Sequence, residues 1–152
     1  RETLFNWLGQ VIDHKTCLDL FSGTGSLGLE SLSRGAHKVT FIEKNFEHFD
    51  KLKSYIEKLD AIEDISIINK DVLAWLDEAN DEFDLIFVDP PFYEQLAEQV
   101  LLKIKTKSLL AKSGNIYLEV EKDLDLSFLE MDWEVIKETI SGRKQYLLLK
   151  EK

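Results

Sequence analysis

The sequence has few of the residues that form disulfide-linked or metal-stabilised folds. Among its 152 residues there is one cysteine, Cys17, and there are two prolines, the adjacent Pro90 and Pro91. A lone cysteine excludes a disulfide framework and a cysteine-based zinc site. The chain also lacks internal repeats and linkers rich in glycine, serine or proline, so a single domain over residues 1–152 is expected.

Long apolar runs are absent as well. No stretch approaches the roughly 20 residues that span a bilayer, and no signal-peptide core is present. The three histidines, His14, His37 and His48, show no metal-ligand spacing. We therefore expect a cytoplasmic protein with no membrane partner and no bound metal.

Positive charge is scarce. The chain has 19 lysines and arginines against 29 acidic residues, a net charge of −10, and its arginines are Arg1, Arg34 and Arg143. Because phosphate contacts need clustered lysine and arginine, this balance argues against a simple polyanion binder. The deficit is uneven, since nine acidic residues and no lysine or arginine lie between Lys70 and Lys103.

Short apolar segments alternate with amphipathic ones along the chain. Strands are predicted at 16–21, 39–42, 65–68, 83–88 and 115–120, and helices at 4–12, from the loop 22–28 to about Arg34, and at 46–59, 71–76 and 93–105. Strands 133–137 and 145–149 have no helix between them. The prediction is an α/β fold with a mostly parallel seven-stranded sheet, a C-terminal antiparallel β-hairpin, and helices on both faces.

The segment 22–28 follows the first strand and contains Gly23, Gly25 and Gly28 in the spacing G-x-G-x-x-G. Glycine lets the backbone turn tightly and approach a ligand closely. Glu43 lies 20 residues after Gly23, at the end of the second strand, where a carboxylate can accept hydrogen bonds from ribose hydroxyls. The pattern fits either a dinucleotide or S-adenosylmethionine.

Two other carboxylates favour S-adenosylmethionine. Asp19 directly precedes the glycine loop, where it would repel a pyrophosphate but could hold the ammonium group of a methionine moiety. Asp71 follows the third strand and could accept a bond from an adenine amino group, with Val72 packed on the ring. Asp71 is equally suited to cap the next helix, and one residue can serve both purposes.

The tetrapeptide Asp89-Pro90-Pro91-Phe92 follows the fourth strand. Ligands of open α/β sheets bind beyond the carboxyl ends of the strands, and two prolines stiffen the loop there. The Asp89 carboxylate and the Pro90 carbonyl can accept the N–H bonds of an exocyclic amine and turn its lone pair toward a sulfonium methyl group. Phe92 can stack on the target base, at roughly 1–3 kcal/mol. Catalysis would come mainly from such positioning.

Together, these motifs resemble the Rossmann-like class I methyltransferases that act on amino groups. The opening Arg1-Glu-Thr-Leu-Phe-Asn-Trp-Leu8 and the closing Gly142-Arg-Lys-Gln-Tyr-Leu-Leu-Leu149 are similar to the bacterial small-subunit rRNA guanine-N2 methyltransferases of the RsmD type. The resemblance covers essentially the whole chain. It implies S-adenosylmethionine as the cofactor and 16S rRNA, or a small ribosomal subunit under assembly, as the partner, with the protein a monomer.

The resemblance also implies roles for individual residues. The expected catalytic residues are Asp89, Pro90 and Phe92. The cofactor-binding set is Asp19, Phe21, Ser22, Gly23, Thr24, Gly25, Gly28, Glu43, Lys44, Asp71, Val72 and Asp89. Substrate contacts are expected from Pro91, Tyr93, Arg143 and Tyr146. In the terminal hairpin, Arg143 and Lys144 are better candidates for RNA contacts than the cluster Lys103, Lys105, Lys107 and Lys112.

Alternatives remain open from the residues alone. The tetrapeptide also suits a methyltransferase acting on DNA bases or on a protein glutamine amide, and the glycine loop also suits an NAD-binding oxidoreductase. The resembled family has a basic stretch ahead of the Arg-Glu-Thr-Leu-Phe segment. We expect such a segment to be missing here and to supply much of the phosphate affinity.

Overall fold

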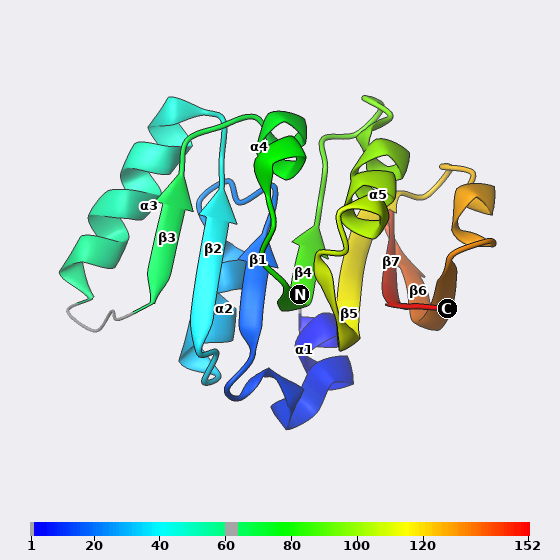
Figure 1. Cartoon of the computed structure of the whole chain (residues 1–152), viewed down its shortest axis with the longest axis horizontal. Helices are drawn as coiled ribbons and strands as arrows, with labels where there is room; N and C mark the ends of the chain where they lie inside the picture. The colour runs from blue at the N-terminus through cyan, green and yellow to red at the C-terminus, as the bar shows by residue number, and fades with distance from the viewer. Residues whose placement is uncertain (1, 60–63) are drawn as a thin grey trace.

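A computed structural model describes residues 2–59 and 64–152, without the side chains of Glu2, Thr3, Gln10 and Val11. Its strands form one seven-stranded sheet in the order β3-β2-β1-β4-β5-β7-β6 (Figure 1). The strands are β1 (Thr16–Asp19), β2 (Lys38–Ile42), β3 (Ile65–Ile68), β4 (Phe83–Val88), β5 (Leu110–Glu121), β6 (Trp133–Ser141) and β7 (Lys144–Glu151). The first five pair in parallel, whereas β7 pairs antiparallel with both β5 and β6.

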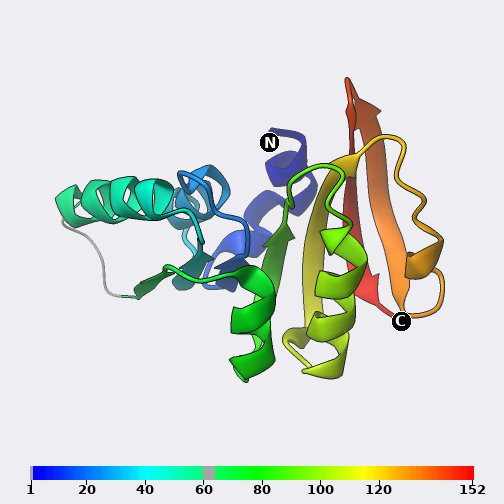
Figure 2. The same ribbon diagram turned by 90° about the horizontal axis from the view of Figure 1, so that it is seen from above.

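Helices cover both faces of this sheet (Figure 2). One face carries α1 (Glu2–Leu8), α2 (Ser26–Ser33) and α3 (Phe46–Lys58), and the other carries α4 (Val72–Glu78) and α5 (Leu96–Thr106). Two short 3₁₀ turns, Gly9–Ile12 and Ser127–Leu129, complete the described elements. The predicted fold class is therefore confirmed, including the antiparallel hairpin at the sheet edge.

The core consists of two apolar layers, one on each face. The strand β4 contributes to both, because Leu85 and Phe87 face the layer under α1, α2 and α3, while Ile86 and Val88 face the layer under α4 and α5. This two-sided burial explains why the sequence of β4 is almost continuously apolar. Cys17 is fully buried, as expected of a small core residue, and burial raises the pKa of its thiol to about 12.

The strand order reverses direction between β1 and β4. From β1 the chain crosses to β2 and then β3 on one side, whereas β4 leads to β5 on the other side. The carboxyl ends of these parallel strands lie along the upper edge in Figure 1. The loops after β1 and β4 diverge at this switch point and leave a crevice, which is where open α/β sheets bind ligands.

The helix predicted at 93–105 begins later, at Leu96. Tyr93 and Gln95 both have left-handed backbone angles, with φ of 63° and 54°, so no helix can start before them. These residues extend the loop after β4, whose first part, Pro90–Phe92, lines the site described below.

Several other boundaries differ from prediction; for example, β6 continues to Ser141, beyond the predicted end at residue 137. The first helix ends at Leu8, because Gly9 has φ of 56° and the chain continues as a 3₁₀ turn to Ile12. Strand β1 stops at Asp19 rather than at Phe21. Strand β5 begins at Leu110 rather than at Asn115, because Leu110 pairs with Phe83 ahead of a register shift. The strands predicted at 65–68 and 83–88 are confirmed at both ends.

Candidate functional site

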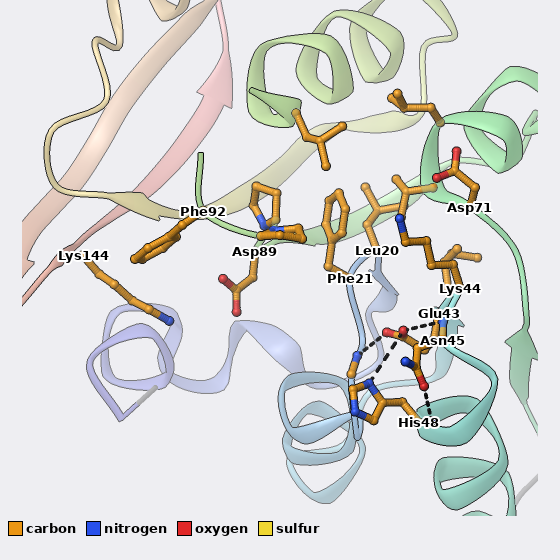
Figure 3. A pocket seen from close by; sticks show the side chains of 17 residues that line it. Leu20, Phe21, Glu43, Lys44, Asn45, His48, Asp71, Asp89, Phe92 and Lys144 are labelled. Atoms are coloured by element: carbon orange, nitrogen blue, oxygen red, sulfur yellow. Dashed lines mark hydrogen bonds and ion pairs between the residues drawn. The ribbon is translucent and has the colours of Figure 1, made fainter. Parts of the chain in front are cut away.

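A pocket of about 510 Å³ opens at the switch point, over the ends of β1, β2 and β4. Figure 3 shows Glu43, Lys44 and Asp71 at one end, Phe92 and Lys144 at the other, and Asp89 between them. The pocket brings together the glycine loop and the Asp-Pro-Pro-Phe loop, which are more than 60 residues apart in the sequence.

Glu43 shapes the glycine loop. Its Oε1 accepts a hydrogen bond from the Gly23 amide at 2.6 Å, and its Oε2 accepts one from the Asn45 amide at 2.8 Å. The side chain is 11% exposed and lines the pocket. Each carboxylate oxygen keeps a second lone pair, so Glu43 can still accept hydroxyl groups of a ribose.

Asp19 lies beneath the loop and does not line the pocket. Its Oδ2 accepts a hydrogen bond from the Gly28 amide, in the first turn of α2, at 3.0 Å. The pKa of the Asp19 carboxyl is raised to about 7: burial is the largest cause, the Gly28 amide opposes the shift, and the charges of Asp89 and Glu43 contribute to it. A cationic ligand group close to this carboxyl would relieve the cost of its buried charge.

Asp71 lies at the same end of the pocket as Glu43, and Val72 follows it in the chain. Asp71 caps α4, because its Oδ2 accepts a hydrogen bond from the Ala74 amide at 3.1 Å, which confirms the capping prediction. Both residues line the pocket together with Leu73. A carboxylate beside two aliphatic side chains suits an aromatic ring that carries an amino group.

The loop after β4 is anchored by the neighbouring strand β5. The Tyr93 amide donates a hydrogen bond of 2.6 Å to Oε2 of Glu121, which is buried at the end of β5. This bond compensates for the left-handed backbone of Tyr93. Tyr93 is 76% exposed, and its ring packs edge to face against the Phe92 ring, with the ring centroids 5.9 Å apart.

Asp89 occupies a crowded acidic position. The pKa of its carboxyl is raised to about 7: burial is the largest cause, the charge of Glu119 and a hydrogen bond to it act in the same direction, and Lys144 opposes them. Glu119 accepts hydrogen bonds from the Tyr117 hydroxyl at 2.8 Å and from the Lys144 ammonium. A cation thus lies beside a pair of carboxyl groups at the pocket wall.

The structure separates the predicted site residues into two groups. Those lining the pocket are Phe21, Gly23, Glu43, Lys44, Asp71, Val72, Asp89, Pro90, Pro91 and Phe92. The others support the wall or lie outside it, namely Asp19, Ser22, Thr24, Gly25, Gly28, Tyr93, Arg143 and Tyr146.

Gly28 supports the wall by close packing. A Cβ at this position would lie 2.2 Å from Cε1 of the buried Phe41 ring. Tyr146 stacks on Tyr117, with ring centroids 6.5 Å apart. Thr24 and Arg143 are exposed.

Several pocket residues were not predicted. Leu20, Ile42, Leu73 and Leu96 supply apolar wall, while Asn45, His48 and Lys144 supply polar groups. His48 Nδ1 lies 3.9 Å from Oε2 of Glu43, so this exposed histidine belongs to the pocket rim. Glu119 was also missed, although the β4–β5 register pairs Val88 with Leu118 and so brings the next residues, Asp89 and Glu119, side by side.

The residues fit S-adenosylmethionine on chemical grounds. The pocket offers carboxylates for hydroxyl and amino groups at one end and an aliphatic wall for a purine. For positive charge there are the carboxyl groups of Asp89, in the pocket wall, and of Asp19, buried beneath the glycine loop. A pyrophosphate, which is negatively charged, would be repelled by these carboxylates. The fold and this distribution of charge place the chain among the Rossmann-like class I S-adenosylmethionine-dependent methyltransferases.

Comparison with known proteins narrows the class. Residues 1–150 match the family described as Conserved hypothetical protein 95. Ribosomal RNA small subunit methyltransferase D of Haemophilus influenzae is 40% identical over 151 residues, which covers 97% of this chain and 78% of that protein. The solved structure of the putative methyltransferase yhhF of Escherichia coli superposes with a TM-score of 0.92 at 35% identity, covering 98% of this chain and 83% of that one.

The chain therefore belongs to this family, that of ribosomal RNA small subunit methyltransferase D. A more distant structure shares the fold alone: the 16S rRNA N2 G1207 methyltransferase of T. thermophilus, solved with AdoMet and guanosine, has a TM-score of 0.79 at 22% identity and covers 99% of this chain and 41% of that one.

Neither a membrane-spanning helix nor a metal-binding cluster accompanies the pocket in the described part of the chain. Within residues 2–59 and 64–152, no helix is long and apolar enough to cross a membrane. The same residues contain no group of three or more histidine, cysteine or acidic side chains that could hold a metal ion.

Proposed function

We propose that this chain transfers the methyl group of S-adenosylmethionine to the exocyclic N2 amine of a guanine in 16S rRNA. The observation that carries the proposal is the place of Asp89. Its side chain lies in the wall of the cofactor-sized pocket, on the same rigid loop as Phe92. The names of the relatives support small-subunit rRNA as the substrate.

Asp89 holds the target amine. Its carboxylate and the Pro90 carbonyl accept the two N–H bonds, which favours a pyramidal nitrogen whose lone pair faces the methyl group. Phe92 stacks on the guanine and restrains it at roughly 1–3 kcal/mol. The new bond joins nitrogen to the methyl carbon while the carbon–sulfur bond breaks, and Asp89 can take the proton that the methylated nitrogen releases, because its pKa lies near 7.

S-adenosylmethionine, when bound, supplies an electrophilic methyl group on a sulfonium sulfur. We assign Glu43 to the ribose hydroxyls, Asp71 and Val72 to the adenine, and Asp19 to the ammonium group. A Cβ added at Gly23 would meet no atom within 4 Å, so there is room for close approach of a ligand to this backbone. The glycine-loop residues that do not line the pocket, namely Ser22, Thr24, Gly25 and Gly28, are assigned to supporting the shape of this loop.

The RNA contacts are assigned to the side of the pocket formed by the hairpin. Tyr93 and Arg143 are exposed near Phe92 and Lys144, and Pro91 is exposed on the loop itself. In the lysine cluster, the two lysines near the C-terminal end of α5 bond carboxyl groups: Lys103 bonds Asp77, and Lys105 bonds Glu151 at 2.7 Å. We propose a monomer that acts in the cytoplasm, where ribosomal subunits assemble.

The test is a methyl-transfer assay with labelled S-adenosylmethionine on small ribosomal subunits, naked 16S rRNA and duplex DNA. We expect labelling of the ribosomal substrates and none of DNA. Asp89→Ala should lower the rate at least about 100-fold, because it removes an acceptor that orients the amine in the transition state. Asp81→Ala is the matched control, since Asp81 is exposed in the loop before β4, at the opposite end of the strand.

The alternatives give different results in the same assay. Labelling of DNA alone, or of a protein glutamine, would replace rRNA as the substrate. Full methyl-transfer activity of Asp89→Ala would contradict the role proposed for Asp89. The NAD-dependent alternative predicts binding of NAD without binding of S-adenosylmethionine, measured by calorimetry, and membership in a methyltransferase family argues against it.

A further inference from the structure

Asp89 and Glu119 form a pair of carboxyl groups that the proposed reaction does not explain. They end up side by side because β4 and β5 are parallel and in register, with Val88 beside Leu118. Glu119 is 8% exposed, and Asp89 is half-buried at the pocket wall. Two carboxylates in contact repel each other, so the pair resists carrying two negative charges.

Lys144 offsets this repulsion from the first residue of β7. Its ammonium group donates to Oε2 of Glu119, while Oε1 of the same carboxylate is occupied by the Tyr117 hydroxyl. Both Glu119 oxygens are thus held, and the charge on Glu119 has a partner. The remaining carboxylate, Asp89, faces the pocket.

Lys144 also touches the aromatic side of the site. Its Nζ lies 5.6 Å from the centroid of the Phe92 ring, within the range of a cation–π contact. Figure 3 shows the lysine extending along the pocket wall below Phe92 and toward Asp89. One side chain therefore lies against Phe92 and extends toward Asp89, the two groups that are proposed to hold the target base.

We propose that Lys144 and Glu119 are positioning residues of the methyltransferase site. Glu119 fixes the Lys144 ammonium group, and this cation favours the charged form of Asp89 against the repulsion of Glu119 and holds the Phe92 ring. The inference rests on the proposed function for the task of Asp89. Glu119 does not line the pocket, so it acts through its neighbours and not through contact with the substrate.

The charged and titratable groups around Asp89 come from three strands. Asp19 of β1 and Glu119 of β5 carry the same charge as Asp89, and Lys144 of β7 carries the opposite charge. Tyr117 of β5 also lies nearby, because the charge of Asp89 raises the pKa of its hydroxyl. Among these groups, Lys144 alone lowers the pKa of Asp89, whereas Glu119 raises it. Removing the two partners should therefore move the titration of Asp89 in opposite directions.

The direct test is a titration of Asp89 in the free chain by NMR, with carbon-13 in the aspartate carboxyl groups and Asp89→Asn to assign the signal. Lys144→Met should raise the Asp89 pKa by about one unit, because a neighbouring cation is lost. Glu119→Gln should lower it by a similar amount, because a like charge is lost while the amide can still accept the Tyr117 hydroxyl. Lys144→Arg, which keeps the charge, should leave the titration close to the wild type.

The second readout is the pH profile of kcat/KM for rRNA methylation. Its acid limb should move to higher pH in Lys144→Met and to lower pH in Glu119→Gln, and a purely structural defect would not move the limb in opposite directions. Shifts of the same sign in both variants, or no shift in either, would overturn the inference. The NMR titration needs no substrate. It therefore tests the effects of Lys144 and Glu119 on Asp89 even if the chain does not methylate guanine and the proposed function is wrong.

Discussion

At the scale of single residues, the site concentrates carboxyl groups where a cation is to bind. Asp19, Glu43 and Asp89 belong to three neighbouring strands or their loops, and the charges of Glu43 and Asp89 both act on Asp19. Burying such charges without a partner costs stability. We therefore propose that the acidity of this part of the chain serves function, because carboxylates suit the sulfonium and ammonium groups of the cofactor.

Asp19 gives a testable case of this cost. The pKa of its carboxyl is about 7 in the folded chain against an ordinary 3.8, so between these pH values the folded state binds a proton that the unfolded state has released. Stability should therefore fall as pH rises from about 4 to about 7. Asp19→Asn keeps an acceptor for the Gly28 amide and should raise the free energy of unfolding at pH 8 by roughly 1–4 kcal/mol.

Denaturant unfolding at pH 5 and pH 8 measures this difference. The stability gained by Asp19→Asn should be larger at pH 8, while binding of S-adenosylmethionine weakens because the predicted ammonium partner is gone. The exposed Asp50→Asn in α3 serves as the control and should match the wild type. Lower stability of Asp19→Asn at pH 8 would show that the charge is not what makes Asp19 costly.

At the scale of elements, the glycine loop and α2 depend on close packing against β2. The ideal Cβ at Gly28 lies 2.2 Å from the Phe41 ring, which is fully buried. Gly28→Ala should destabilise the fold by about 1–3 kcal/mol, because a packed aromatic ring must shift. Thermal unfolding checks the loss.

A double variant shows whether the ring is the cause. In a Phe41→Leu background, Gly28→Ala should cost less, since the smaller side chain leaves room for the methyl group. Equal losses in both backgrounds would place the strain elsewhere in α2.

The sequence was sufficient to predict the elements that position the site. The spacing of Gly23, Gly25 and Gly28 and the Asp-Pro-Pro-Phe tetrapeptide each follow a strand, and parallel strands end at one edge. The start of α5 was not predictable in the same way. Tyr93 and Gln95 adopt positive φ without being glycine, and the Tyr93 conformation depends on a bond to Glu121, 28 residues away.

The pair Glu119 and Lys144 was missed for a related reason. Its recognition needs the register between β4 and β5 and the antiparallel pairing of β7 with β5. A single sequence indicates which segments are strands, but not which residues lie opposite one another. The register between strands that are far apart in the sequence therefore determines this part of the site, and sequence motifs alone could not predict it.

At the scale of the whole molecule, the net charge of −10 no longer conflicts with an RNA substrate. Carboxyl groups occupy the pocket, and lysines on α5 are paired with acidic residues. The exposed Arg143 lies instead at the tip of the hairpin, next to Lys144 of the pocket. This arrangement favours RNA approach from the hairpin side.

Arg143→Ala should accordingly weaken rRNA binding and reduce the slope of log affinity against log salt by about one, because one phosphate contact is lost. Lys112→Ala is the control, since Lys112 is exposed near the start of β5, at the other end of the sheet. Affinity measured over a salt series separates the two. An equal effect of both variants would mean that the RNA surface is not at the hairpin.

The most direct test of the central claim is to identify the methylated nucleoside. Small ribosomal subunits lacking the modification are incubated with the chain and S-adenosylmethionine that carries a deuterated methyl group, and the digested RNA is analysed by mass spectrometry. The proposed role of Asp89 predicts labelled N2-methylguanosine, which disappears with Asp89→Ala. Label on a ring nitrogen or on another base, or undiminished N2-methylguanosine with Asp89→Ala, would contradict it.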